Sequence, residues 1–469
     1  MKNKIILFEL NEVPFKVLDW YCQRNQRSNF AFLCQRSQQF KTRTEDKVMS
    51  PWVTWPSAHR GVFDSHHKIS FLGQDLESAD KKYPPVWQIL SDNGFRTGVF
   101  GSLQSYPVPK DLSNYAFYVP DVFAPSNETF PESLNAFQQL NLVMSRESAR
   151  NVSHGIPAKI ALQLATQLPS LGISPATIAD LVQQLVLERV DSSKLARRRT
   201  YQGVLAADIY LRLLNKTKPE FSTFFTNHVA SNMHRFWAAT FPEDFDPSEH
   251  KPEWSERYKA EIEFAMHKAD AFLGQLLKFV NANRHYAIWV ASSMGQGAEE
   301  KIPYVESMLL IADKNKFMKR LGLEKNDWEE RPAMVPDYSF YVSPEKADRF
   351  RHLIQSLIID GKTIPIYEES NNFFHISLGH TDLDGSEQLA TLDGQKISFE
   401  NLGLRCVESQ DSVSASAYHV REGIFLIYES PAKQSIDRTV LPSTEIAPLI
   451  LENFGIPVPG YMRQHSLVG

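Results

Sequence analysis

The stretch Pro85–Gly101, PVWQILSDNGFRTGVFG, decides the fold class of this chain. Val86–Asn93 has the apolar spacing of a short amphipathic helix, and Gly94 follows it as a stop signal. Arg96–Phe100 then has the composition of a buried strand. A helix that leads directly into a strand is half of a β–α–β unit, and such units place their strands in parallel.

The same alternation continues outward along the chain. We predict strands over Ile5–Phe8, Phe221–Thr226, Tyr286–Ala291, Val305–Ala312 and Gly423–Tyr428. We predict helices over Phe15–Tyr21, Glu253–Asn281 and Thr444–Phe454. The predicted fold is therefore α/β, with a mostly parallel central sheet and helices on both faces. Ligands of such sheets lie outside the carboxyl ends of the strands. In this chain the polar residues Asn11 and Glu12 follow the first predicted strand and are therefore expected at that position.

Two regions interrupt this alternation. Residues 105–215 hold Pro- and Asn-rich loops and then helical patterns such as Ala158–Leu168 and Ile178–Val190, and we interpret them as an inserted helical cap. Residues 315–405 are mixed and are interpreted as a second insertion or smaller subdomain. The core is then expected from residues 1–104, 216–314 and 406–469, because a chain of 469 residues is long enough for two or three packed units.

The composition is that of an ordinary globular protein, with 42% hydrophobic and 22% charged residues. The net charge of -5 favours neither nucleic acid nor an anionic membrane as a partner. Three cysteines without metal-type spacing are too few for a disulfide framework. Glu9 breaks the apolar start of the chain, so neither a signal peptide nor a transmembrane segment is expected. We predict a cytoplasmic protein, with peripheral membrane contact as the alternative.

A second stretch, Ser50–Ile69 (SPWVTWPSAHRGVFDSHHKI), carries candidate chemistry. A helix beginning near Pro56 would place the Thr54 hydroxyl just before its start. The first backbone N–H groups of a helix are unpaired, which favours an alkoxide nucleophile or a bound oxyanion there. In the following turns His59 is a candidate acid or base and Arg60 a candidate oxyanion clamp. A solvent-facing helix start is the alternative for both.

Five segments in the same order resemble the alkaline phosphatase superfamily and, within it, the type I phosphodiesterase/nucleotide pyrophosphatase branch. They are IILFELNE, PWVTWPSAHRG with SHHKI, PVWQILSDNGFRTGVFG, FFTNHVASNMHRFW, and SAYHVREGIFLIYESP with STEIAPLILENFGIPVPGYM. The resemblance implies an alkaline phosphatase-like core with two divalent ions at the strand ends, about 4 Å apart. It also implies that Thr54 is the nucleophile and that His234 and His419 bind metal.

Other positions depart from the family pattern. Asn11 stands at the first-strand Asp, Ala230 at the Asp before His234, and Ser293-Met294 at an Asp-His pair. A serine hydroxyl is a poor ligand for a divalent ion, and a thioether suits copper(I), so one metal subsite is expected to be lost.

The other metal subsite can be rebuilt from residues of this chain. His228, His234 and His419, with Asn11 or Glu12 nearby, would make a zinc site, because three imidazoles and an open position suit that ion. The alternative is that each histidine only makes hydrogen bonds and that no metal binds.

Two functions from different classes follow from these residues. The first is a hydrolase or transferase acting on a small phospho- or sulfo-ester or glycan-linked substrate, with Thr54 as nucleophile and one divalent metal, zinc by preference. The second is a catalytically degenerate family member that binds a phosphorylated or sugar-linked ligand or a protein partner, because backbone N–H groups hold an anion without chemistry. A third possibility, reuse of the frame in cell-surface polymer assembly, rests on the ELNEVP-like start alone.

Overall fold

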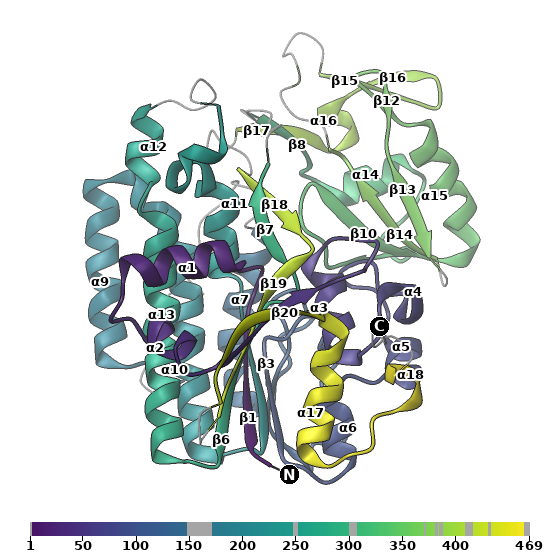
Figure 1. Cartoon of the computed structure of the whole chain (residues 1–469). Coiled ribbons are helices and arrows are strands. Elements are labelled where there is room, and N and C mark those ends of the chain that lie inside the picture. Colours follow the sequence, from purple (N-terminus) through teal and green to yellow (C-terminus); the bar gives the residue numbers. More distant parts are fainter. Residues whose placement is uncertain are drawn as a thin grey trace.

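The computed structural model describes residues 2–147, 171–246, 252–299, 307–369, 372–379, 383, 388–408, 416–429 and 433–463. Its central strands are β1 (Lys4–Leu10), β2 (Gln38–Arg43), β3 (Thr97–Phe100), β4 (Tyr115–Val119), β5 (Phe221–Thr226), β6 (Tyr286–Ala291), β19 (Glu422–Tyr428) and β20 (Ser435–Pro442). They form an eight-stranded sheet in the order β20-β2-β19-β6-β1-β5-β3-β4 (Figure 1). Only β19 pairs antiparallel with its neighbours, so the predicted α/β class with a mostly parallel sheet is confirmed.

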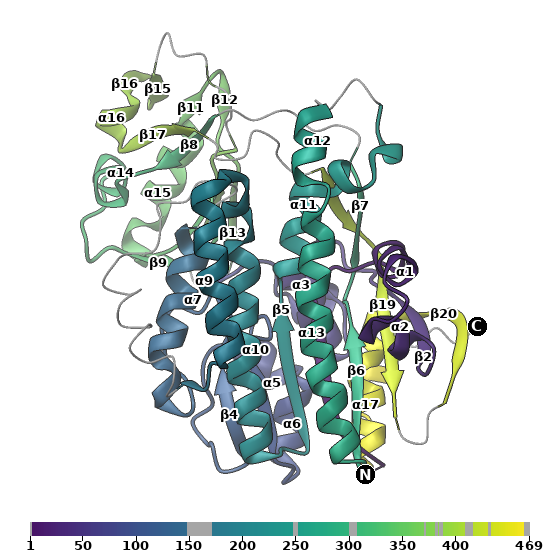
Figure 2. The ribbon, with the colours of Figure 1, turned by 90° about the vertical axis from the view of Figure 1, so that its left-hand side faces the viewer.

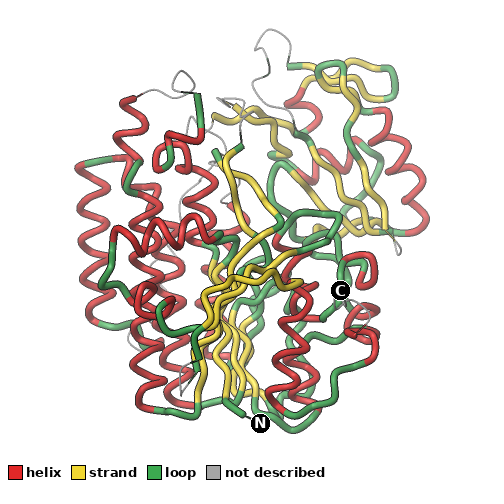
Figure 3. Tube along the Cα trace, viewed as in Figure 1, coloured by secondary structure: helices red, strands yellow, loops and turns green. Residues whose placement is uncertain are grey.

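Helices cover both faces of this sheet (Figures 2 and 3). One face carries α1 (Phe15–Arg24), α2 (Asn29–Cys34), α7 (Asn135–Glu147), α9 (Pro175–Val190), α10 (Arg198–Thr217), α11 (His228–Thr240) and α13 (Glu261–Ala282). The other carries α3 (Pro51–Arg60), α6 (Val86–Asp92), α17 (Ile446–Phe454) and α18 (Gly460–Arg463). Along β1, Ile6 and Phe8 join the first hydrophobic cluster and Ile5 and Leu7 the second, because successive strand side chains point to opposite faces. Burial on both faces explains the continuous apolar run that predicted this strand.

Most of the predicted elements lie where their patterns placed them, and the bounds of β5 and β6 agree with the prediction. The long helix predicted over Glu253–Asn281 is two helices, α12 (Pro252–Tyr258) and α13. The chain turns between them, so that α12 packs on α11 through Tyr258 and Phe236, whose ring centroids are 4.8 Å apart. The helix predicted over Ala158–Leu168 lies outside the described residues.

The region expected as a helical cap contributes directly to the central sheet. β4 is its edge strand and pairs in parallel with β3. α10 packs on the sheet rather than over its end, with Tyr210 against Phe224 of β5. The sequence pattern did not reveal β4, because Pro- and Asn-rich loops flank it on both sides. Since β4 belongs to the central sheet, a domain boundary at residue 105 would separate it from the other strands.

A smaller α/β unit leaves and rejoins the core through the antiparallel pair β8 (Ser307–Ile311) and β17 (Leu404–Glu408). It holds β9 (Trp328–Arg331), β10 (Asp337–Val342), β11 (Ile358–Ile359), β12 (Lys362–Thr363), β13 (Ile366–Glu369), β14 (Phe373–Ser377), β15 (Leu389–Leu392), β16 (Gln395–Ser398), α14 (Lys314–Arg320), α15 (Pro344–Ser356) and α16 (Phe399–Leu402). These elements enclose their own hydrophobic cluster. The unit contacts the core where His375 stacks on Phe71, with ring centroids 4.2 Å apart.

Among the described residues, no helix combines the length and the apolar character needed to cross a membrane.

Candidate metal centre

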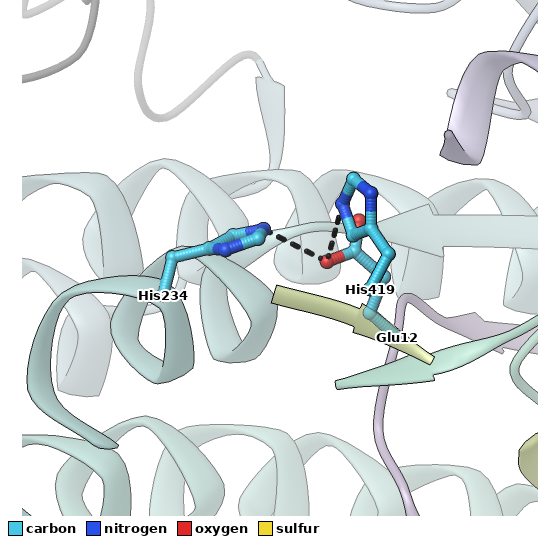
Figure 4. A group of neighbouring side chains, drawn as sticks. All are labelled: Glu12, His234 and His419. Carbon is cyan, nitrogen blue, oxygen red and sulfur yellow. Dashed lines mark ion pairs between the residues drawn. The ribbon is translucent and has the colours of Figure 1, made fainter. Parts of the chain in front are cut away.

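Three side chains converge outside the carboxyl ends of the central strands (Figure 4). Glu12 follows β1, and His234 lies on α11, the helix that follows β5. His419 comes from β18 (Ala417–Val420), which pairs with β7 (Gly295–Ala298), the short strand after β6. One ligand atom from each of the three side chains lies within 4.8 Å of the other two. The topology thus brings together residues more than 400 positions apart in the sequence, at the end of the sheet where ligands are expected.

The hydrogen bonds of the two imidazole rings fix their orientation. His234 Nδ1 lies 2.8 Å from the carbonyl oxygen of Ala417, and His419 Nδ1 lies 2.6 Å from that of Met49. A carbonyl oxygen only accepts, so we assign the ring hydrogen to Nδ1 in both residues. In the neutral ring, Nε2 then presents a lone pair.

Both Nε2 atoms face the same carboxylate oxygen. Glu12 Oε2 lies 3.0 Å from Nε2 of His234 and 3.5 Å from Nε2 of His419. Two lone pairs and a carboxylate oxygen repel one another unless a proton or a metal cation lies among them. An imidazole whose Nδ1–H is bonded to a carbonyl while Nε2 points at the ligand position is the usual arrangement of a metal-binding histidine.

Glu12 is held rigidly for this position. Its backbone has φ 59°, a left-handed conformation that is rare outside glycine and often found at functional sites. Gln296 Nε2 donates to Oε2 of Glu12. Burial of the carboxyl raises its pKa, but when no metal is bound and the rings are protonated, the charges of His419 and His234 and their hydrogen bonds outweigh burial and hold the pKa of Glu12 well below its usual range. The ionised carboxylate is the form that binds a metal.

Asn11 was predicted as a metal ligand, but the structure gives its side chain other partners. Asn11 Oδ1 accepts a hydrogen bond of 2.7 Å from Trp55 Nε1, and Nδ2 donates to Glu12 Oε1 at 2.8 Å. Nδ2 also lies 2.7 Å from Asn227 Oδ1. Asn11 therefore orients the carboxylate of Glu12, its neighbour in sequence. In the sequence, Glu12 could have been recognised as a candidate ligand because its carboxylate directly follows a buried strand.

His228 is not brought together with His234 and His419. Its Nδ1 lies 2.6 Å from Thr226 Oγ1 and its Nε2 lies 3.1 Å from the Ala265 carbonyl oxygen, so both ring nitrogens are engaged. Burial lowers the pKa of His228 to about 4. His228 and His234 are six residues apart on α11, where their side chains project roughly 120° from each other. The structure therefore groups His234 and His419 with Glu12 and not with His228.

Thr54 lies inside α3, because this helix begins at Pro51 and not near Pro56. The Thr54 backbone N–H already donates to the Ser50 carbonyl oxygen at 2.9 Å. Its side chain is fully buried, with Oγ1 2.8 Å from Oγ of Ser293. Ser293 is the residue that stands at the family's Asp, so the two hydroxyls bond to each other where the resemblance implied a nucleophile and a metal ligand.

His59 and Arg60 point away from the metal centre. Both residues lie on the same unbroken helix as Thr54, and their positions on it direct their side chains toward the core. The prediction of a helix beginning near Pro56 did not give this orientation. His59 Nε2 lies 2.7 Å from Glu9 Oε1, and both side chains are completely buried. Arg60 is buried and its Nη2 donates to Asp80.

A buried hydrogen-bond chain follows α3. The Ile69 N–H donates to His67 Nδ1 at 2.9 Å, so the neutral ring carries its hydrogen on Nε2 and donates to Ser57 Oγ, also at 2.9 Å. Ser57 Oγ donates in turn to Asp46 Oδ1 at 2.7 Å. His67 is thus a donor to the serine and not its base, which makes this set structural.

Two members of this hydrogen-bond chain, His67 and Asp46, make the stability of the fold depend on pH in opposite directions. Burial lowers the pKa of His67 to about 3, so the unfolded state gains a proton first and stability falls as pH drops below about 6.5. Burial raises the pKa of Asp46 to about 6, so its contribution is complete below pH 3.8 and is lost as pH rises through 6.

Replacement of His67 separates the two effects. We expect His67→Gln to be less stable than wild type at pH 7.5, with a deficit that shrinks by about 2 kcal/mol at pH 5. Urea unfolding at both pH values measures this change, and a deficit independent of pH would contradict it.

A cavity of about 280 Å³ opens from the metal centre. Glu12, His234 and His419 line one end, and most of the remaining wall is apolar. Arg199 of α10 and Arg235 of α11 also line it. Arg199 is the last of three consecutive arginines, and the other two pair with carboxylates: Arg197 with Glu261 and Arg198 with Glu188.

Fold and site together define an α/β protein with a carboxylate and two imidazoles directed at one point beside a mostly apolar cavity. No protein-family model matches the sequence, and no curated protein matches it. Similar solved structures include mouse ectonucleotide pyrophosphatase/phosphodiesterase 5, with 10% identity over 97% of this chain and 96% of that chain and a TM-score of 0.41. Phosphonoacetate hydrolase from Sinorhizobium meliloti 1021, solved with phosphonoformate, has 12% identity over 96% of each chain and a TM-score of 0.38. Likenesses this distant identify neither a family nor an activity.

Proposed function

We propose that this protein is a hydrolase or transferase of a small phospho- or sulfo-ester that uses one divalent ion, with zinc the best fit. Glu12, His234 and His419 are the proposed ligands. The observation that carries the proposal is the pair of Nε2 lone pairs directed at one buried carboxylate oxygen. Two histidines and a glutamate with an open fourth position form a known type of catalytic zinc site.

An ion bound there would polarise an ester oxygen and lower the pKa of a coordinated water. The chain's own residues would do the rest. The Met49 and Ala417 carbonyls keep both rings in the ligating tautomer, while Asn11 and Gln296 hold the carboxylate. Apolar walls reduce the water around the reacting group, which strengthens electrostatic interactions there.

Thr54 is the proposed nucleophile within the same scheme. Helix α3 is tied to the metal centre twice: Met49, just before it, accepts from His419, and Trp55 donates to Asn11. The Thr54 hydroxyl is bonded to Ser293, and Thr54 is not among the residues that line the cavity. Attack on a bound ester therefore requires the side chain to turn from Ser293 toward the cavity.

Thr54→Val tests this role. If the hydroxyl is the nucleophile, metal-dependent turnover of 4-nitrophenyl phosphate or sulfate esters should fall at least about 1,000-fold, because covalent catalysis is lost, and zinc content should not change. Ser293→Ala is the matched control, since it breaks the same hydroxyl pair and keeps Thr54. Full turnover by Thr54→Val would assign the attack to water.

A second candidate is a protein that binds a phosphorylated or sugar-linked ligand without turnover. It is favoured by the burial of Thr54 and Ser293 and by the bond between their hydroxyls. A zinc-loaded protein that binds a phosphonate but hydrolyses none of these esters would support this candidate and reject the enzyme.

A further inference from the structure

The cavity beside the metal centre is an elongated slot. From Glu12, after β1, its lining passes the carboxyl ends of β5, β3 and β4 in turn, at Phe225, Phe100 and Val119. These four strands are neighbours in the sheet. Adjacent strands are about 4.8 Å apart, so the slot is about 14 Å long from β1 to β4. The lining is therefore long enough to run beside an alkyl chain of several carbons or an aromatic ring.

The metal end of the slot also has a fixed positive charge. Arg199 Nη1 donates to Ser231 Oγ at 3.3 Å, and Ser231 lies three residues before His234 on α11. Residues with this spacing are about one helical turn apart, roughly 5–6 Å between Cβ atoms. A guanidinium is always charged, and its planar set of donors suits phosphate and sulfate oxygens. Arg199 is therefore positioned one turn from the metal ligand His234.

Gly203 allows α10 to bring Arg199 this close. A Cβ atom on Gly203 would lie 2.9 Å from His228 Nδ1 and 3.0 Å from Thr226 Oγ1. Any larger residue would therefore push α10 away from the carboxyl end of β5. The approach of the helix fixes the width of the slot beside its charged end.

The far end of the slot is mostly apolar. The residues that line it after β3 and β4 are Phe100, Gly101, Val119, Pro120, Val122 and Phe123. The polar residues Gln202 and Asn141 also line the slot, but Gln202 Nε2 already donates to Asn141 Oδ1 at 3.1 Å. Hydroxyl groups of a ligand placed against the six apolar residues would lose water without gaining hydrogen bonds from those side chains, at a cost of roughly 1–3 kcal/mol for each group. A sugar alcohol is disfavoured there, and an apolar group is favoured.

We propose that the slot selects phosphate or sulfate esters of an apolar alcohol. The anion lies between the metal centre and Arg199, and the alkyl or aryl group extends along the ends of β5, β3 and β4 toward Phe123. This inference rests on the proposed function and adds the chemical class of the alcohol and the residue that recognises the anion.

Non-hydrolysable phosphonates test the proposal by binding alone. Isothermal titration of the zinc-loaded full chain should give at least 10-fold tighter binding for hexylphosphonate than for methylphosphonate. Phe123→Ala should reduce that ratio at least threefold and leave the affinity for methylphosphonate unchanged. Phenylphosphonate shows whether a ring also fits.

Arg199→Gln should weaken both phosphonates about 10-fold and preserve their ratio. Arg198→Gln is the matched control, because Arg198 pairs with Glu188 and is absent from the lining of the slot. Equal loss in the two arginine variants would overturn the role of Arg199. A chain that takes up zinc but binds methyl- and hexylphosphonate equally would overturn the slot and leave the metal centre intact. A chain that takes up no zinc would overturn the proposed function itself.

Discussion

Glu12→Gln is expected to lower the affinity for zinc at least about 100-fold, because loss of even an outer partner of a metal ligand costs 10- to 100-fold. The substitution removes the only carboxylate among the three proposed ligands Glu12, His234 and His419. The amide keeps the shape of the side chain, so that the change reports the lost charge and ligand atom. Competition with a chelator of known affinity measures the effect, together with zinc content after gel filtration.

Thermal unfolding provides a second readout of the same ligand. A bound ion stabilises the folded state by about 4 kcal/mol when its concentration is 1,000 times Kd. Added zinc should therefore raise the Tm of the wild type, and a chelator should reverse the rise. In Glu12→Gln this response should disappear.

Glu422→Gln is the matched control, because Glu422 is a half-exposed glutamate that pairs with Lys41 at the surface. It should bind zinc as the wild type does. Should Glu12→Gln still bind one zinc with unchanged affinity, Glu12 is not a ligand. Circular dichroism shows whether the variant is folded, and His234→Gln gives an independent test of the same centre.

His59→Leu should destabilise the protein by roughly 3–5 kcal/mol, because it leaves the Glu9 carboxylate buried without its partner. The two side chains are both 0% exposed, and their atoms are 2.7 Å apart. Replacement of both members of such a pair by apolar residues is often nearly neutral. The double variant Glu9→Met/His59→Leu should therefore recover most of the stability, as measured by urea unfolding.

The same variants distinguish a structural His59 from a catalytic one. A structural role predicts that the double variant keeps its zinc affinity and its turnover. If the double variant is stable and binds zinc but has lost turnover, His59 acts as the acid or base that the sequence suggested. A single variant as stable as wild type would show that the Glu9 pair contributes nothing measurable.

The fold was largely predictable because its signals are local. The apolar runs of β1, β5 and β6 and the amphipathic pattern of α17 each depend on burial of a few neighbouring residues. β4 was not predicted, because an edge strand among Pro-rich loops has a weak pattern of its own. The start of α3 was also misplaced. Pro56 looks like a first helical residue, yet here it lies inside the helix, and the carbonyl oxygen of Trp52 accepts from Gln104 instead.

The candidate site was predictable only in part. His234 and His419 were identified by their resemblance to family motifs, but His228 was grouped with them, and the sequence left open whether Asn11 or Glu12 lies beside them. Nothing local separates Asn11 from Glu12, because both follow the same strand. Which of the two side chains faces His234 and His419 depends on two features of the folded chain: Trp55 donates to Asn11, and the backbone of Glu12 is left-handed.

Local sequence patterns were enough to predict the α/β alternation, the parallel sheet and the end of the sheet that carries polar residues. These follow from hydrophobic periodicity and from the geometry of β–α–β units. Three further features emerge from the folded chain alone: Glu12 lies beside His234 and His419, Thr54 bonds to Ser293, and Arg199 lines the cavity whereas Arg198 does not. The physical reason is that these contacts join distant parts of the chain, and their atoms meet only after the whole sheet has assembled.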